Sequence, residues 1–370
     1  MYLDNAATTP LKPEVKEYVI SLLDTYQNPS STYQSGVNVK QIITTARKNV
    51  AKFINADPQD IIFTSGGSAS NTLAIKGYES IHNCIIYYSP LLHKSALKYI
   101  ETLYYNTEQL KVDCNGLIDI MDFKNRMNSL KYNPFVIIEY ANSEIGTIQN
   151  VKEIINITHK FNGIVYLDCT GSISTIPLDI KELNCDLAGF SAHKLGALKG
   201  TGVLYKKTTI ELEPLIYGTQ EQGLFAGTEN TIGIGALGKA VENYDYSSIT
   251  SKNRDYVYEY ILKNIPNSYL VGESIGEYRL PHNLYICFDG IQGESLMTLL
   301  DMDDIQVSTG SACTSGDLAP SPTLAAIGMN KADINSCIRM SFSGNETKDE
   351  LNYLCKKLKK NIETLRQLNK

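Results

Sequence analysis

Short apolar, β-branched segments alternate with segments of helical periodicity up to about residue 250, and this alternation limits the fold more than any other feature. Strands are predicted at 61–64, 84–88, 135–140, 164–168, 186–191 and 201–205. Helices are predicted between them, at 70–80, 93–105, 121–130 and 151–161. Alternating strands and helices build a mostly parallel sheet that is covered by helices. The sequence therefore predicts an α/β fold.

The pattern changes after about residue 250, where helical stretches alternate with short strands predicted at 285–288 and 338–341. The last helix opens at the capping-box sequence Thr347-Lys-Asp-Glu350 and runs to about residue 368. Leucine and isoleucine recur along it with helical period, which indicates a face packed in a core. We therefore expect a large domain at 15–250 and a smaller α+β domain made of 1–14 and 251–370.

The composition argues against several classes of protein. The net charge is −6 and no basic stripe is present, so we expect no direct binding to nucleic acid. The N-terminus resembles no signal peptide, and no stretch approaches the roughly 18 apolar residues of a membrane span. Eight cysteines are scattered without a CxxC pair, so we expect neither a disulfide framework nor a metal site. These features predict a reduced, cytoplasmic protein that does not enter membranes.

Two candidate site residues follow the expected strand at 186–191. His193 and Lys194 stand just beyond it, with glycines close behind. Ligands of mostly parallel sheets bind at the carboxyl ends of the strands. A lysine amine in such a place can form a Schiff base with an aldehyde cofactor. The alternative is a surface lysine, which is the commoner role of a lysine taken alone.

The segment 64–71 reads Thr-Ser-Gly-Gly-Ser-Ala-Ser-Asn and joins a predicted strand to a predicted helix. Backbone N–H groups and the positive end of the helix dipole at such a start suit a phosphate group. The segment is not a Walker loop, because no Gly-Lys-Ser/Thr follows. The alternative is an ordinary capped turn.

Three further polar residues stand at expected strand or helix ends or within a strand. Asp168 ends the strand at 164–168 and could hold a protonated pyridine nitrogen, or else form a salt bridge or helix cap. His93 begins a predicted helix and could stack on a flat ring and shuttle protons, or else be a capping or core histidine. Arg339 lies in an apolar strand and needs an anion, either a substrate carboxylate or a structural partner.

Cys313 lies in the segment 307–316, where its neighbours are glycine, serine, alanine and threonine. Buried structural cysteines are normally surrounded by large apolar side chains. Small neighbours indicate a thiol that is presented to solvent on a loop. The thiol is therefore either a reactive nucleophile or an ordinary loop cysteine.

Taken together, these segments resemble the cysteine desulfurases of the NifS and IscS type, in the class V pyridoxal-phosphate aminotransferase superfamily. The resemblance covers nearly the whole chain, and its motifs occur in the family's order. They lie at 2–9, 28–31, 143–146, 191–194, 220–221, 226–228, 293–294 and 311–315.

The resemblance implies a fold-type I transferase with pyridoxal 5'-phosphate as its cofactor. Lys194 matches the lysine that binds the cofactor as a Schiff base, Asp168 the aspartate at the pyridine nitrogen, and His93 the histidine stacked on the ring. Positions that bind the phosphate are matched by Gly67, Ser68, Ser191, His193 and Thr228. In the family the last of these reaches the phosphate of the neighbouring subunit, which implies a homodimer with shared active sites.

The resemblance also implies the reaction. L-cysteine would become L-alanine, with Lys194 moving the Cα proton and His93 assisting as an acid–base group. Arg339 matches the arginine that takes the substrate carboxylate, and Cys313 matches the cysteine that becomes a persulfide. The sulfur would then pass to an acceptor protein, such as an iron–sulfur scaffold, for cluster assembly or thiolation.

The chain departs from the family at several polar positions. The family asparagine before Glu-Ile-Gly is Ser143 here, with Asn142 one place earlier, and the glutamine three residues after the aspartate is Gly171. Both family residues normally touch the cofactor's phenolic oxygen, and the asparagine also helps to hold substrate. We therefore expect Ser143 near the cofactor and Asn142 near the substrate. The other departures are Ala69, Tyr33, Gln222 and Phe225.

These departures leave two alternatives open. One is another pyridoxal-phosphate enzyme, such as a selenocysteine lyase or an aminotransferase, although an aminotransferase needs no loop thiol. The other is a non-catalytic scaffold subunit of the same fold. The retained Lys194, His93 and Cys313 favour a desulfurase, because a scaffold does not need all three.

Overall fold

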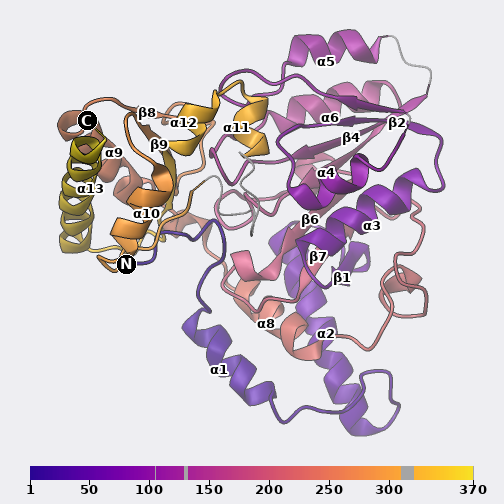
Figure 1. Cartoon of the computed structure of the whole chain (residues 1–370). Coiled ribbons are helices and arrows are strands. Elements are labelled where there is room, and N and C mark those ends of the chain that lie inside the picture. Colours follow the sequence, from indigo (N-terminus) through magenta and orange to yellow (C-terminus); the bar gives the residue numbers. More distant parts are fainter. Residues whose placement is uncertain (105, 129–131, 310–320, 370) are drawn as a thin grey trace.

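The computed structural model describes residues 1–104, 106–128, 132–309 and 321–369. In these residues the strands form a seven-stranded sheet and a three-stranded sheet, with helices packed around both (Figure 1). None of the described helices is both long enough and apolar enough to cross a bilayer.

The seven-stranded sheet is mostly parallel, as the sequence predicted. Its strands lie in the order β1 (Ile61–Thr64), β7 (Gly202–Lys206), β6 (Leu187–Ser191), β5 (Ile164–Asp168), β4 (Asn133–Glu139), β2 (Cys84–Tyr88) and β3 (Thr107–Gln109). All neighbouring pairs from β6 to β3 are parallel, whereas β7 runs antiparallel to both β6 and β1. The carboxyl ends of β4, β5 and β6 therefore meet at one edge of the sheet.

Both faces of this sheet are buried. Phe135 and Ile137 of β4 belong to one apolar cluster, and Val136 and Ile138 belong to the other, because successive side chains of a strand point to opposite faces. The first cluster includes residues of α3 (Gly67–Glu79) and α4 (Lys94–Ile100). The second includes residues of α2 (Gln34–Phe53), α5 (Ile120–Met127), α6 (Val151–Lys160), α7 (Ile180–Leu183) and α8 (Thr231–Val241).

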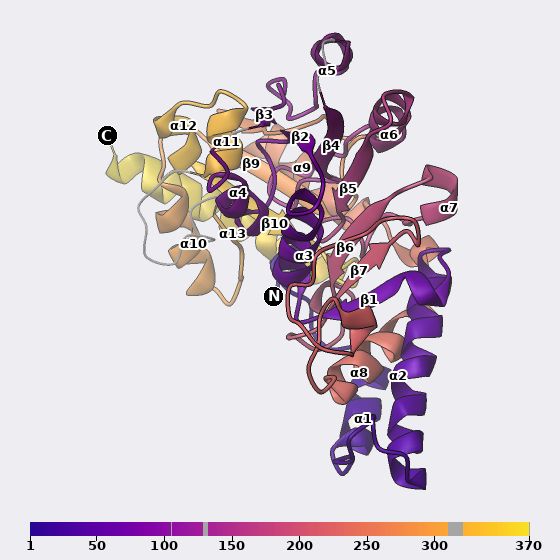
Figure 2. The same cartoon turned by 90° about the vertical axis from the view of Figure 1, so that its right-hand side faces the viewer.

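The helices α1 (Pro13–Leu22) and α2 were not predicted from the sequence. Both contact α8, and Figure 2 shows them below the sheet, at the end of the molecule away from α5. The buried residues of α2 include Val39, Ile43 and Val50, which are four and seven residues apart among mostly polar neighbours. This narrow apolar stripe explains why the helix packs well and yet carries a weak sequence signal.

The smaller sheet is antiparallel, in the order β10 (Cys337–Ser341), β9 (Asn283–Phe288) and β8 (Ser268–Leu270). It shares an apolar cluster with α9 (Lys252–Asn264), α10 (Gly293–Asp301) and α13 (Lys348–Leu368). The predicted capping box of α13 is confirmed, since Thr347 Oγ1 accepts from Glu350 N and the Glu350 carboxylate accepts from Thr347 N. Two short helices, α11 (Pro322–Ala326) and α12 (Lys331–Asn335), precede β10.

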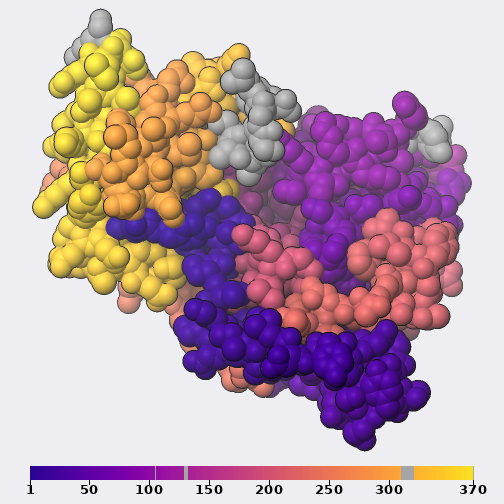
Figure 3. Space-filling view, turned by 60° about the horizontal axis from the view of Figure 1, so that its bottom comes forward, coloured from indigo at the N-terminus to yellow at the C-terminus, as the bar shows by residue number. Residues whose placement is uncertain are grey.

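The N-terminal residues join the smaller sheet. Leu3 is fully buried in its apolar cluster, and its carbonyl accepts from the backbone N–H of Ser341. The chain then crosses toward α1, and Figure 3 shows this indigo segment between the yellow and orange residues of the C-terminal part and the larger body. Residues 4–9 are thereby brought to the junction between the two sheets.

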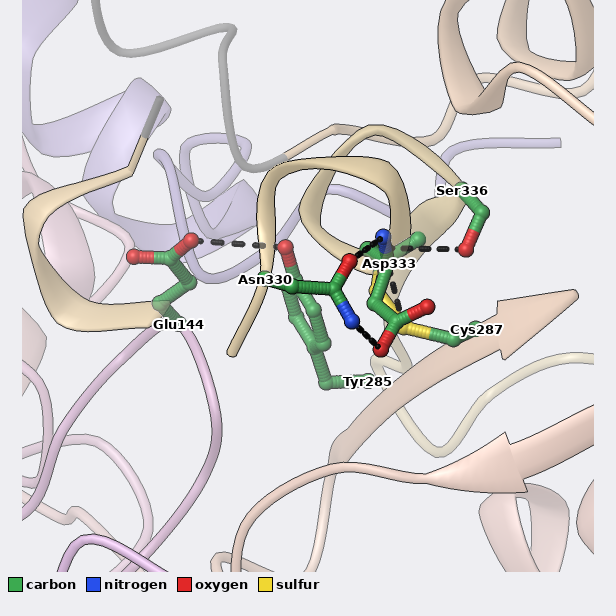
Figure 4. Close-up of a disulfide and its surroundings, with 7 residues drawn as sticks. Glu144, Tyr285, Cys287, Asn330, Asp333 and Ser336 are labelled. Carbon is green, nitrogen blue, oxygen red and sulfur yellow. Dashed lines mark hydrogen bonds between the residues drawn. A yellow bond between two sulfur atoms is a disulfide. The ribbon is translucent and has the colours of Figure 1, made fainter. Parts of the chain in front are cut away.

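One feature differs from the expectation of reduced cysteines. Cys287 and Cys337 stand directly opposite each other on β9 and β10 and are joined as a disulfide (Figure 4). The two residues are 50 positions apart in the sequence, so only the strand register brings them together. Cys84, Cys169, Cys185 and Cys355 are free and buried, and Cys114 is free and exposed.

Gly202 provides a test of the packing between β7 and the loop before α3. A Cβ at this position would meet the backbone of Gly66 at 2.5–2.8 Å. We expect Gly202→Ala to lower the free energy of unfolding by about 1–3 kcal/mol, measured by urea denaturation, because the loop must move to admit the methyl group. Gly276→Ala is the matched control, since a Cβ there meets nothing within 4 Å. Equal losses in both variants would contradict this packing.

Candidate active site

A cavity of about 350 Å³ lies between the carboxyl ends of β4, β5 and β6, the N-terminal segment and β10. This volume lies in the range of small-molecule sites. Ten of the predicted site residues line it, namely Lys194, His93, Asp168, Gly67, Ser68, Ser191, His193, Ser143, Asn142 and Arg339. Thr228 is exposed and is not among the lining residues. Cys313 lies outside the described residues.

Lys194 projects from a short 3₁₀ turn, Ala192–Lys194, that follows β6. Its Nζ donates to the carbonyl oxygens of Ala6 at 2.5 Å and Ala7 at 2.7 Å. The N-terminal segment therefore holds the amine at the cavity before any ligand arrives. The neighbouring His193 faces Thr8, with 3.0 Å between Nδ1 and Oγ1. Burial, reinforced by Lys194 and Lys199, lowers the pKa of His193 to about 4, so its imidazole is neutral at neutral pH.

The start of α3 forms a close-fitting cradle. The backbone N–H of Gly67 donates to Ser191 Oγ at 2.7 Å. A Cβ on Gly67 would meet Ser191 Oγ at 2.7 Å and Thr170 Oγ1 at 2.9 Å, so a larger residue would fill this space. Hydroxyl groups and the positive end of a helix dipole together suit an anion. With the amine of Lys194 and the carboxylate of Asp168 in the same cavity, the lining residues fit pyridoxal phosphate.

Asp168 is 4% exposed and is fully hydrogen-bonded. Its Oδ1 accepts from Thr170 N at 2.9 Å, and its Oδ2 accepts from Asn71 Nδ2 at 3.0 Å. The Asn71 amide is itself fixed, because the Tyr166 hydroxyl donates to its Oδ1. Donors on both oxygens favour the ionised form of a buried carboxyl. Asp168 could therefore pair with a cationic group bound in the cavity.

The same asparagine reaches His93. Asn71 Nδ2 also donates to Ser95 Oγ at 2.9 Å, and this hydroxyl lies 2.8 Å from His93 Nδ1. Because His93 Nδ1 also accepts from Ser95 N, a neutral His93 carries its proton on Nε2. His93 is therefore the helix cap that the sequence allowed, and it still lines the cavity with Nε2 available to a ligand.

Arg339 on β10 meets the expected structural partner and also lines the cavity. One Nη donates to Asp4 Oδ1 at 2.8 Å and the other to the Ser143 carbonyl at 3.2 Å. Its Nε makes no hydrogen bond in the part of the chain that the structure describes. A substrate carboxylate would thus approach a guanidinium that is already oriented by an acidic residue.

The departure at Gly171 has a steric cause. A Cβ there would meet the Ala141 carbonyl oxygen at 2.6 Å and the backbone nitrogen of Ser143 at 3.2 Å. The segment carrying Asn142 and Ser143 therefore occupies the space of a side chain at 171. The Asn142 side chain turns to the backbone, donating to Leu91 O at 3.0 Å and accepting from Glu144 N and Ile145 N. Direct substrate binding by this amide stays a prediction.

Two polar residues of the site were missed in the sequence. Asn71 was read only as part of a phosphate-binding turn, and its bridging role depends on partners that are 24 and 97 residues away. Glu139 ends β4 inside a run of buried apolar residues, and it lines the cavity. A single carboxyl inside an apolar strand was the available signal, because such a group is rarely fully buried without a function or a partner.

Asn71→Ala tests the network around Asp168. Losing the amide leaves buried polar atoms of Asp168 and Tyr166 without partners, so we expect a loss of about 2–4 kcal/mol in the free energy of unfolding. Thr72→Ala on the same helix removes only a hydrogen bond to Ser68 O and serves as the control. Chemical denaturation of both variants measures the difference, and equal stabilities would refute the network.

Glu139 makes stability depend on pH. Burial is the main cause that raises the pKa of Glu139 from 4.5 to about 7. Between these values the folded protein keeps a proton that the unfolded chain has lost, so this group makes the protein less stable as the pH rises. In Glu139→Gln this loss, about 3 kcal/mol by pH 7, is absent. Urea unfolding at pH 5 and pH 7.5 measures this effect. The free energy of unfolding of the variant should rise relative to that of the wild type between the two pH values, and a constant difference would contradict the assignment.

Comparisons with known proteins identify the family of the chain. Residues 1–354 match the family described as Aminotransferase class-V. The cysteine desulfurase IscS of Dictyoglomus turgidum is 37% identical over all of this chain and 96% of its own length. That of Methanosarcina thermophila is 35% identical over all of this chain and 93% of its own length.

Solved structures give the same result. A NifS-like protein superposes with a TM-score of 0.88 at 29% identity, covering 98% of this chain and 99% of that one. The NifS-like protein of Rickettsia africae superposes with a TM-score of 0.89 at the same identity and coverage. With its mostly parallel sheet and with a lysine, a carboxylate and the start of a helix lining one cavity, the chain belongs to the class V aminotransferases, among the pyridoxal-phosphate-dependent cysteine desulfurases of the IscS and NifS type.

Proposed function

We propose that the chain converts L-cysteine to L-alanine, takes the sulfur onto Cys313 as a persulfide, and passes it to an acceptor protein for iron–sulfur cluster assembly or thiolation. The observation that carries this proposal is the cavity in which Lys194, Asp168, His93 and Arg339 meet. A nucleophilic amine, a buried carboxyl, an imidazole and a carboxylate-binding cation are the groups that this reaction needs.

Different residues of the cavity would bind different parts of the cofactor. Lys194 would bind it as a Schiff base, Asp168 would accept from the ring nitrogen, and the start of α3 with Ser191 would hold the phosphate. His93 lines the same cavity and would stack on the ring of the cofactor. When bound, pyridoxal phosphate supplies a ring that withdraws electrons from the substrate's Cα.

The substrate steps then fall to the chain's own side chains. Arg339 binds the substrate carboxylate, Lys194 moves the proton at Cα, and His93 holds a proton on Nε2 that it can give to substrate. The Cys313 thiolate attacks the substrate sulfur, so that an S–S bond forms and the Cβ–S bond breaks. The electron pair stays with Cβ, which takes up a proton and becomes the methyl group of alanine.

Further parts of the proposal concern the assembly. We infer a homodimer in which Thr228 of each chain serves the partner's phosphate site, and its exposed position outside the cavity lining supports this arrangement. We also infer a large domain at 15–250 and a small one at 1–14 plus 251–370, supported by the separate apolar cluster of Leu3, Val257 and later residues. A cytoplasmic location would give the protein its sulfur acceptors.

The test of the activity is product formation from L-cysteine by purified protein loaded with pyridoxal phosphate, in the presence of a thiol reductant. Alanine and sulfide should appear in equal amounts. A protein that binds the cofactor and forms neither product would refute the proposed desulfuration. Comparing L-selenocysteine with L-cysteine at matched concentrations separates the desulfurase from a selenocysteine lyase.

Cys313→Ala tests the sulfur acceptor within the chain. We expect the variant to bind the cofactor with an unchanged absorption spectrum and to lose sulfide release by at least about a hundredfold, because the attacking thiolate is gone. Cys114→Ala is the matched control, since Cys114 is a free, exposed cysteine. Sustained sulfide release by Cys313→Ala would remove this cysteine from its role.

A further inference from the structure

Glu139 is a second buried carboxyl at the cavity floor, beside Asp168. It is the last residue of β4, and the register of the sheet sets it directly opposite Asp168, the last residue of β5. Each of the two residues is 4% exposed, and both line the cavity. The desulfuration steps proposed above make no use of Glu139.

The two carboxyls have very different hydrogen-bond partners. Both oxygens of Asp168 accept from N–H donors, as described above. Glu139 Oε1 accepts from Gln149 Nε2 at 3.2 Å, whereas Oε2 makes no hydrogen bond within the described residues. Two carboxyls in one buried site do not both ionise readily, and the one with more donors ionises first. Negative charge is therefore held more favourably at Asp168 than at Glu139, whose Oε2 has no donor among the described residues.

Asp168 is the charged side chain that affects the pKa of Glu139. Ser89 follows β2 and Gln149 follows β4, and both are neutral groups that favour the ionised form, as does a backbone hydrogen bond of Glu139, although burial outweighs them. Lys94, Lys194 and Arg339 line the cavity, but none of them is among the charges that shift the pKa of Glu139, and Lys194 and Arg339 contact the N-terminal segment instead. Burial and the Asp168 charge together raise the pKa of Glu139 to about 7.

We propose that Glu139 is a positioning residue that acts through Asp168, sharing its proton with solvent near neutral pH while the site is empty and giving up the rest of that proton when the cationic ring nitrogen of the cofactor pairs with Asp168. The pairing neutralises the negative charge that opposed ionisation of Glu139. Cofactor binding removes little further water from Glu139, because its Oε2 is already buried. Desolvation therefore adds little to the cost of releasing the proton. Two carboxylates then face one ring nitrogen, which strengthens its hold on the proton and keeps the ring electron-poor.

Proton release on cofactor binding tests this inference. Pyridoxal phosphate is titrated calorimetrically into cofactor-free wild-type protein and Glu139→Gln at pH 7, in two buffers of different ionisation enthalpy. Protons from Lys194 and the phosphate are common to both proteins and cancel in the comparison. We expect the wild type to release more protons per site than the variant, by up to roughly half a proton, because a pKa of about 7 leaves about half of the Glu139 side chains protonated at pH 7. Equal proton counts in two proteins that both bind the cofactor would overturn the inference.

Glu153→Gln is the matched control, because it removes an exposed carboxyl that pairs with Lys124 on the surface. Its proton count should equal that of the wild type. Should Glu139→Gln not bind the cofactor, a second measurement decides. The carboxylic-acid infrared band of Glu139 is titrated in cofactor-free wild type and Asp168→Asn, and an unchanged pKa in Asp168→Asn would overturn the inference.

The inference rests on cofactor binding and not on the proposed desulfuration, so the two can fail separately. A wild type that shows the extra proton release but forms no alanine would refute the desulfuration alone. A wild type that forms alanine and sulfide but shows no extra release would refute the role of Glu139 alone.

Discussion

The site depends on one buried carboxylate, Asp168, at the end of β5. An ionised group that is 4% exposed persists only when donors replace the water it has lost, and Thr170 N and Asn71 Nδ2 do so. Asn71 belongs to α3, whose first turn forms the cradle described above. Its amide also donates to Ser95 Oγ, and this hydroxyl contacts His93 Nδ1. One amide, that of Asn71, therefore connects β5, α3 and His93. It links the carboxyl of Asp168, the position of the cradle and the orientation of the His93 ring.

The N-terminal segment supplies the second constraint, because it binds two of the cations that line the cavity. Carbonyls of Ala6 and Ala7 bind the Lys194 amine, and the carboxylate of Asp4 binds Arg339. Leu3 anchors this segment in the core of the smaller sheet. Lys194 follows the larger sheet and Arg339 lies in the smaller one, so a displacement between the two sheets would alter the site from both sides.

Sequence alone predicted the parts of the fold with strong local patterns. The buried runs of β2 and β5 were predicted at their observed bounds, and the capping box located the start of α13. The strands β3 and β8 were missed because each has three residues, none of them buried, and so offers no period to detect. The disulfide between Cys287 and Cys337 depends on strand register, which no local pattern encodes. Lys194 and Asp168 were predicted as site residues because ligands of such sheets bind at the carboxyl ends of strands, and both residues line the cavity.

Asn71 and Glu139 show the limit of that reasoning, because their roles lie in what surrounds them. Asp168 and Glu139 are both carboxyls, both end neighbouring parallel strands, and both are equally buried. What separates them is the number of donors, since Asp168 accepts two N–H bonds while Oε2 of Glu139 accepts none in the described structure. In a site with low dielectric this difference makes negative charge more favourable at Asp168 than at Glu139. The charge at the floor of the cavity therefore follows from hydrogen-bond geometry rather than from residue type.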